Sequence, residues 1–135
     1  IYSDIAAAQA VFTSGVPVTV VPLDVSQQTL VSAARLAALE PDVAGILDRC
    51  AAFSRERWGH HAGPLHDPNV LARIAAPELY AGQCGVVRVS DQGRTVLEPG
   101  AGPHEVMLTV DAEGYLDWVW RYLDAAASSA AKRLQ

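Results

Sequence analysis

The chain has few of the features that mark nucleic-acid-binding, membrane or disulfide-rich proteins. Its 135 residues carry 10 Lys and Arg against 15 Asp and Glu, a formal net charge of −5. The basic residues are scattered, so there is no basic stripe that would neutralise phosphates. No apolar run approaches the roughly 20 residues of a membrane-spanning helix, and there is no signal-peptide pattern. We therefore expect neither a nucleic-acid partner nor a membrane partner.

Cysteine is also scarce, because Cys50 and Cys84 are the only two in the sequence. They lie in unrelated segments and lack the CxxC spacing of zinc and redox sites. We predict buried, reduced thiols, as in a cytoplasmic enzyme. Half of the residues are hydrophobic, which is enough for one packed domain over residues 1–135.

The first part of the sequence predicts α/β structure. Residues 4–14 read as a helix with Asp4 as N-cap, and Gly15 follows as the residue that ends it. The run 16–23 is continuously apolar and β-branched, which favours a strand covered on both faces. A further helix over 26–39, with Ser26 as N-cap, would flank this interior strand on its other side. A helix followed by a buried strand is typical of α/β folds.

The rest of the sequence predicts helices around a hairpin. Apolar residues at helical spacing, among them Cys50 and Phe53, predict a helix from about Asp42 to Trp58. Residues 84–90 and 94–97 alternate as strands around an Asp-Gln-Gly turn, and 104–110 is another strand. The predicted C-terminal helix, 115–134, turns Leu116, Val119, Tyr122 and Leu123 towards the core.

The sequence HDP at residues 66–68 has two readings. Asp67 is a favoured helix N-cap and Pro68 a favoured first helical residue, so the motif can simply open a helix through Ala75. Alternatively, the His66 imidazole exchanges protons near neutral pH while the Asp67 carboxylate binds a hard cation. The tripeptide alone permits both readings.

A family resemblance bears on that choice. GPLHDP at residues 63–68 follows SGVPVTVVPLDV at residues 14–25, and this combination resembles the C-terminal half of a calcium-dependent nucleoside hydrolase of the inosine-uridine type. The resemblance covers nearly the whole chain. It implies an α/β nucleoside hydrolase fold, of which this half supplies a buried strand with flanking helices, a β-hairpin and a long C-terminal helix. The N-terminal half would be absent.

The resemblance also implies the chemistry. Asp67 would be a Ca²⁺ ligand and His66 the general acid that protonates the departing base, while a metal-activated water hydrolyses the N-glycosidic bond of a ribonucleoside to free base and ribose. The family's Asp-rich cluster and its Glu-x-Asn pair are not in this sequence. Because calcium takes about 6–8 oxygen ligands, we expect the isolated chain to be inactive.

Several further side chains are candidates for the substrate site. Ser54 and Trp58 share a helical face and would border the nucleobase, with Trp58 either stacking on the base or packing beneath the loop. His60 and His61 read as acid, ligand or surface residues near a helix end. Asp24 lies at the end of a strand, where α/β sites tend to sit, although a helix-capping or turn role explains it better.

Two other functional classes remain open. The chain could be a non-catalytic nucleoside- or sugar-binding module, or a subunit that completes its site with a separate N-terminal chain. The resemblance also implies a homo-oligomer. Whether purine or pyrimidine nucleosides are preferred is not encoded in these residues.

Overall fold

The computed structural model describes the backbone of residues 1–59 and 63–133, together with their side chains except those of Trp58, Pro64 and residues 126–133. The expectations for His60 and His61, and for the side chain of Trp58, fall outside this description. None of the described helices is both long enough and apolar enough to cross a bilayer.

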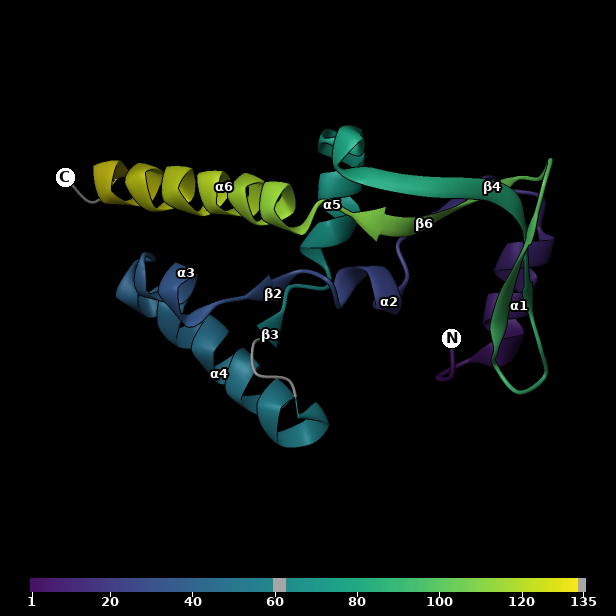
Figure 1. The fold of residues 1–135 in the computed structure, drawn as a ribbon, viewed down its shortest axis with the longest axis horizontal. Helices are drawn as coiled ribbons and strands as arrows, with labels where there is room; N and C mark the ends of the chain where they lie inside the picture. Colours follow the sequence, from purple (N-terminus) through teal and green to yellow (C-terminus); the bar gives the residue numbers. More distant parts are fainter. Residues whose placement is uncertain (60–62, 134–135) are drawn as a thin grey trace.

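A mixed sheet forms the centre of the fold, with four strands in the order β1-β6-β4-β5 (Figure 1). β1 (Val18–Val20) runs parallel to β6 (His104–Val110). β6 is antiparallel to β4 (Tyr80–Val89), which forms a hairpin with β5 (Thr95–Pro99). The hairpin and the strand over 104–110 were both expected from the sequence and are confirmed.

Helices lie at opposite ends of this sheet. At one end α1 (Ile5–Thr13) packs against β4, and the Asp4 carboxylate accepts the Ala7 N–H at 2.8 Å, so the predicted N-cap is confirmed. At the other end α6 (Ala112–Arg133) extends away from the sheet (Figure 1). Gly15 adopts φ 79°, the left-handed conformation that ends a helix and that glycine adopts without strain.

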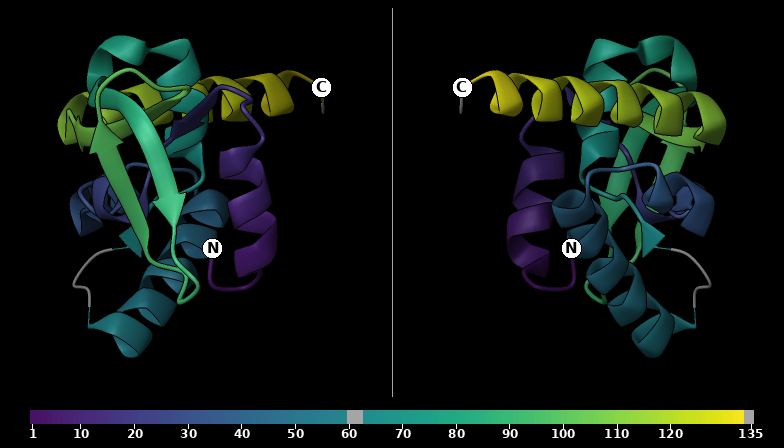
Figure 2. Two further views of the ribbon diagram at one scale, coloured as in Figure 1. Left: turned by 90° about the vertical axis from the view of Figure 1, so that its right-hand side faces the viewer. Right: turned by 90° about the vertical axis from the view of Figure 1, so that its left-hand side faces the viewer.

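A second group of elements supplies most of the residues that pack against α6. It contains α2 (Leu23–Ser26), β2 (Leu30–Val31), α3 (Ala33–Ala37), α4 (Pro41–Trp58), β3 (Gly63–Pro64) and α5 (Pro68–Ala75), followed by the 3₁₀ turn η1 (Pro77–Leu79). β2 and β3 form a small antiparallel sheet. α4 projects away from the four-stranded sheet (Figures 1 and 2).

The main apolar core joins these elements to α6. Tyr115, Leu116, Val119 and Trp120 of α6 are buried against Val31, Leu39 and Ala72. Arg35 of α3 pairs with Glu113 and Asp117 on the exposed side of α6. Its guanidinium also lies 5.8 Å from the Trp120 ring centroid, a cation–π distance. The helical layer is therefore tied to α6 by both apolar and charged contacts.

The strand predicted over 16–23 is shorter than expected and is not interior. Only Val18–Val20 is a strand, and within the described sheet it lies at an edge beside β6. Val18 and Val20 are half-buried while Thr19 is exposed. The apolar side chains thus face inwards as expected, but the prediction that both faces and both edges are covered was wrong for this chain.

Other expectations also fail. The helix predicted over 26–39 is broken into α2, β2 and α3, and Ser32 rather than Ser26 caps the last of these, accepting the Arg35 N–H. Tyr122 is exposed, and its ring lies tilted against Trp118 rather than entering the core. Cys50 and Cys84 are free thiols as predicted, but both are exposed rather than buried.

Two glycines offer a matched test of this packing. Gly85 lies where β4 is paired with both β5 and β6, and a Cβ added there would clash with the Glu98 backbone carbonyl. Gly85→Ala should therefore destabilise the fold by about 1–3 kcal/mol. Gly45 lies in α4 with room for a methyl group, so Gly45→Ala should stabilise by about 0.5–1 kcal/mol. Urea unfolding measures both. Equal effects of the two substitutions would contradict the β4 packing.

Candidate functional site

His66 is held against α2 by a serine. Its Nδ1 lies 2.8 Å from the hydroxyl of Ser26, the buried last residue of α2. The Ser26 hydroxyl in turn donates to the Leu23 carbonyl at 3.2 Å. A hydroxyl carries one hydrogen, so while it donates to Leu23 it accepts from an Nδ1–H. Nε2 is then the imidazole nitrogen that remains for a ligand.

The residue before His66 is fixed through its carbonyl oxygen. Leu65 O accepts from Asn69 Nδ2 at 2.6 Å and from the Tyr115 hydroxyl at 2.9 Å. These donors come from α5 and α6, and they match the two lone pairs of a carbonyl oxygen. The peptide that leads into His66 therefore cannot move without breaking contacts to two helices.

A buried polar network extends from this point. Asn69 is fully buried; its Nδ2 also donates to Thr29 Oγ1 at 3.2 Å, and its Oδ1 accepts from the Tyr80 hydroxyl at 2.9 Å. Thr29 Oγ1 donates to the Ser26 carbonyl at 2.7 Å, which links the network back to α2.

Both tyrosines of the network remain hydrogen-bond donors. Burial raises the pKa of Tyr80 to about 12, and burial likewise raises the pKa of Tyr115. Both phenols therefore keep their protons at neutral pH. These residues, with Ser26, Thr29 and Asn69, were missed from the sequence. Buried polar side chains carry no periodic signal that would distinguish them from helix caps and amphipathic core residues.

Asp67 does not act as the predicted helix cap. It has φ −64° and ψ −41°, which is helical rather than extended, and its side chain makes no capping hydrogen bond. Its carboxylate is exposed beside His66 and is thus available to a cation. Among the described residues, however, no three His, Cys, Asp or Glu side chains gather as a metal site. Among the described residues that line the hollow beside His66, Asp67 supplies the one carboxylate, which is far short of a calcium coordination shell.

A hollow of about 540 Å³ lies between α4 and the segment that carries His66 and Asp67. Its volume is within the range of small-molecule sites. Ser54 faces it together with His66 and Asp67, so three of the four predicted site residues meet there. Trp58, the fourth, ends α4. The remaining lining is mostly apolar or thiol: Ile46, Leu47, Arg49, Cys50, Phe53, Leu65 and Pro68.

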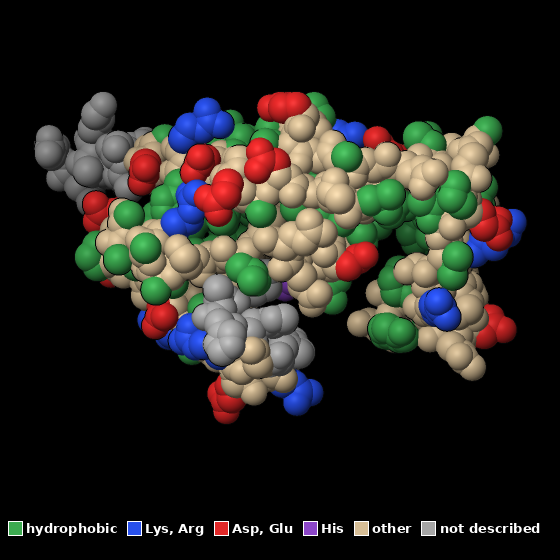
Figure 3. Space-filling model, in the orientation of Figure 1, with side chains coloured by type: hydrophobic (Ala, Val, Ile, Leu, Met, Phe, Trp, Pro, Cys, Tyr) green, Lys and Arg blue, Asp and Glu red, His purple; other side chains and the backbone are tan. Residues whose placement is uncertain are grey.

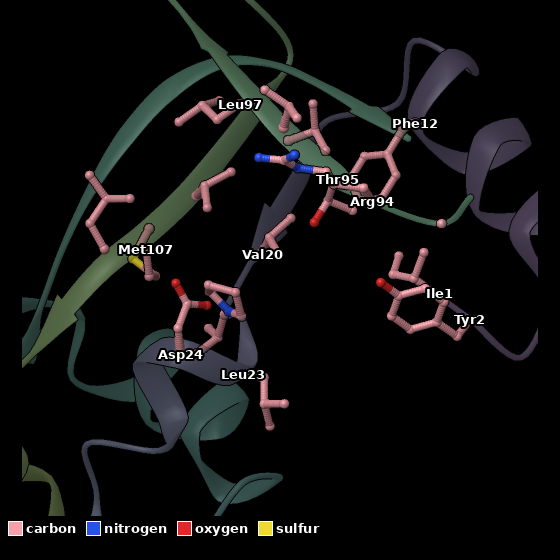
Figure 4. Close-up of a pocket in the computed structure, with 17 residues that line it drawn as sticks. Ile1, Tyr2, Phe12, Val20, Leu23, Asp24, Arg94, Thr95, Leu97 and Met107 are labelled. Atoms are coloured by element: carbon pink, nitrogen blue, oxygen red, sulfur yellow. The ribbon is translucent and has the colours of Figure 1, made fainter. Parts of the chain in front are cut away.

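A larger hollow of about 640 Å³ lies elsewhere, between α1, β1 and the β4–β5 hairpin (Figure 4). Asp24 borders it at the end away from α1. None of His66, Asp67 and Ser54 lines this space, and most of its wall is aliphatic or aromatic. We place the candidate chemistry in the smaller hollow, because His66 and Asp67, the residues predicted as acid and cation ligand, both line it.

Tyr115 and Tyr122, both on α6, allow the clamp on Leu65 to be tested. Tyr115→Phe removes the hydroxyl bound to Leu65 O and should cost about 1 kcal/mol. Tyr122→Phe alters an exposed ring and should stay within about 0.5 kcal/mol. The measurement is urea unfolding with the His66 ring resonances followed by NMR, which should shift only in Tyr115→Phe. Unchanged His66 resonances in that variant would contradict the clamp.

Comparison with known proteins identifies the family. The profile of the inosine-uridine preferring nucleoside hydrolases matches residues 1–117. The pyrimidine-specific ribonucleoside hydrolase RihA of Shewanella woodyi is 32% identical over 142 residues, covering 92% of this chain and 46% of that protein.

Two solved structures agree with this assignment. The plant nucleoside hydrolase PpNRh1 superposes with a TM-score of 0.76 and 26% identity, covering 86% of this chain and 44% of that one. The purine-preferring ribonucleoside hydrolase of Gardnerella vaginalis gives 0.73 and 26%, covering 83% and 41%. The chain spans less than half the length of these relatives. The expected α/β architecture is confirmed, and the chain belongs to the inosine-uridine preferring nucleoside hydrolase family.

Proposed function

We propose that the chain carries the leaving-group side of a ribonucleoside hydrolase site, which cleaves the N-glycosidic bond to free base and ribose. The observation that carries the proposal is the His66 ring, anchored by Ser26 through Nδ1 at 2.8 Å. Its second nitrogen is left for a ligand in a hollow shared with Asp67 and Ser54. Family membership supports this reading over a non-catalytic binding module.

In the proposed reaction His66 acts as the general acid. A base leaves a nucleoside poorly as an anion, so a proton delivered from Nε2 assists its departure. The Ser26 hydroxyl, backed by the Leu23 carbonyl, accepts from Nδ1–H and so keeps the ring oriented while Nε2 gives up its proton. The rigid Leu65 peptide holds the imidazole at one place in the hollow.

Asp67 would contribute one ligand to Ca²⁺, with the others supplied from outside this chain. A bound divalent cation would supply an activated water for attack on the sugar. The exposed carboxylate of Asp67, which is not used for capping, fits this role as a single ligand. The chain alone does not fit a complete calcium site.

The base would lie against α4. Ser54 faces the hollow, and Trp58 is four residues further along the same helix, a spacing that puts both on one face. The proposal covers ribonucleosides without a base preference, because one relative is named as pyrimidine-specific and another as purine-preferring. The free thiols of Cys50 and Cys84 are compatible with a cytoplasmic enzyme, and a homo-oligomer remains part of the proposal.

The isolated chain should bind calcium weakly and release no base from nucleosides, because one carboxylate cannot replace about 6–8 oxygen ligands. Isothermal calorimetry with calcium chloride and an assay for free base measure both properties. A micromolar dissociation constant for the chain alone would overturn the proposal that most ligands come from outside it.

A chimaera tests the acid. The chimaera is S. woodyi RihA in which the region that aligns with this chain has been exchanged for this chain. His66→Ala should slow hydrolysis of natural nucleosides by roughly 10²–10⁴-fold, yet leave p-nitrophenyl riboside nearly unaffected, because that leaving group departs without a proton. Asp67→Ala should abolish both reactions by removing a ligand.

An exposed carboxylate on α6 provides the control. Asp124→Ala removes a charge outside the hollow and should preserve both rates. If His66→Ala damages both substrates equally while calcium affinity is unchanged, His66 is not the leaving-group acid.

A further inference from the structure

Asn69 is the buried residue at which the hydrogen bonds around His66 converge. Its Nδ2 donates to Leu65 O at 2.6 Å and to Thr29 Oγ1 at 3.2 Å, and its Oδ1 accepts from the Tyr80 hydroxyl at 2.9 Å. A carbonyl oxygen can only accept, so the amide nitrogen is the end that faces Leu65. The orientation of the Asn69 side chain is therefore fixed, and both hydrogens of its nitrogen are used.

Each of the two donated bonds holds one partner of the contact between Ser26 and His66. Leu65 directly precedes His66, so the first bond holds the peptide that carries the imidazole. The second bond holds Thr29, whose backbone N–H and hydroxyl both donate to Ser26 O, at 3.2 and 2.7 Å. Ser26 is thus tied at its carbonyl, while its hydroxyl contacts His66 Nδ1 at 2.8 Å.

The two segments that meet at Asn69 are far apart in the sequence. Asn69 and Thr29 are separated by 40 positions. Thr29 Oγ1 also lies 3.5 Å from Leu65 O, so the three residues form a closed ring of contacts. This ring joins the end of α2 to the start of α5, and it sets the distance between the serine and the imidazole.

The network around Asn69 is made of uncharged groups. It contains the hydroxyls of Thr29 and Ser26 and the phenol of Tyr80. Burial raises the pKa of Tyr80 to about 12, so the phenol keeps its proton. Acidic side chains gather instead at the surface over α6, on the face drawn in Figure 3. Hydrogen bonds between neutral groups fix distance and direction, so this network acts on where the imidazole and its hydrogen lie.

Holding Ser26 in place selects one form of the His66 ring. The Ser26 hydroxyl donates to Leu23 O at 3.2 Å and therefore accepts from an Nδ1–H. When the proposed general acid delivers a proton from Nε2, the neutral ring that remains carries its hydrogen on Nδ1. Ser26 thus favours the form of the ring that exists after proton transfer, as long as its hydroxyl stays within hydrogen-bond reach.

We propose that Asn69 is a positioning residue for the His66 imidazole. By holding the Leu65 peptide and, through Thr29, the end of α2, it keeps the Ser26 hydroxyl on Nδ1. Asn69 is not among the residues that line the hollow, so it acts on the substrate only through the imidazole. This role rests on the proposed function, because it adds a residue to the same site.

The place of the ring hydrogen is the first test, made on the chain itself. Long-range ¹H–¹⁵N NMR at about pH 8, where imidazoles are largely neutral, shows which nitrogen carries the hydrogen. In the unsubstituted chain it should lie on Nδ1 of His66. Thr29→Val removes the hydroxyl between Asn69 and Ser26 and should give a mixture of the two tautomers. Thr29→Ser keeps a hydroxyl and should restore the single tautomer.

Two substitutions in α5 separate positioning from packing. Asn69→Leu removes both donated bonds and should give the same mixture of tautomers. Arg73 lies four residues further along α5 and binds both carboxylate oxygens of Glu105, at 3.0 and 2.8 Å. Arg73→Gln should therefore lower stability in urea by loosening the other end of the helix, and it should leave the Nδ1–H tautomer of His66 unchanged.

The chimaera with S. woodyi RihA gives the second test, on the reaction. Asn69→Leu and Thr29→Val should each lower kcat for natural nucleosides by about 10- to 100-fold, the effect of a misplaced catalytic group, with KM little changed. Thr29→Ser should recover most of the rate. p-Nitrophenyl riboside should be hydrolysed nearly as before in every variant, since its leaving group needs no proton.

Three results would overturn the role of Asn69. One is an Nε2–H tautomer in the unsubstituted chain, and another is a single Nδ1–H tautomer retained in Thr29→Val. The third is the same mixture in Arg73→Gln, because packing of α5 would then explain it. If Asn69→Leu does not fold, Thr29→Val decides. A changed tautomer with unchanged rates on natural nucleosides would instead count against the proposed reaction only.

Discussion

The carbonyl oxygen of Leu65 is the point on which the arrangement of this protein depends. This oxygen belongs to the peptide bond that precedes His66. It accepts hydrogen bonds from the Asn69 side-chain amide of α5 and from the Tyr115 hydroxyl of α6. α5 reaches β4 through the bond between Asn69 and Tyr80 and reaches α2 through Thr29, whereas α6 contributes the residues of the apolar core. One backbone atom thus connects the apolar core around α6 to the start of α5 and to the imidazole beside it.

The constraint is strict because the network is buried. Asn69 is fully buried, and an amide that loses its partners in such a place costs about 1–3 kcal/mol. Every polar atom named around it has a partner in Thr29, Tyr80 or Leu65. A rearrangement of the His66 peptide would therefore leave several buried donors unpaired at once, and a fully satisfied network favours one geometry.

Sequence alone was informative where structure is local. The Asp4 cap, the glycine turn of the hairpin and the long helix α4 follow from capping and periodicity, because their cause lies within a few residues. Segment 26–39 could not be predicted in this way. Its break depends on β2 pairing with β3 across more than thirty residues, register Leu30 with Pro64, and no local pattern records such a partner.

The residues proposed for the site were chosen from the sequence, but the side chains that hold them were missed. His66, Asp67 and Ser54 do meet in one hollow, since family resemblance placed them. Ser26 was expected to cap a helix, yet its hydroxyl contacts His66. The edge position of β1 was also missed, because an apolar run reads the same whether its neighbour strand belongs to this chain or to another polypeptide.

The two walls of the hollow are held very differently, and this bears on how such a site can evolve. The wall that carries His66 is fixed by a buried network that accepts few substitutions. The facing side chains of α4, among them Ile46, Cys50 and Phe53, are exposed, while α4 is anchored through other residues such as Val43 and Leu47. Mutations on that face cost little stability. In the proposed site, preference for a base can therefore drift along α4 while the side that carries His66 stays constant.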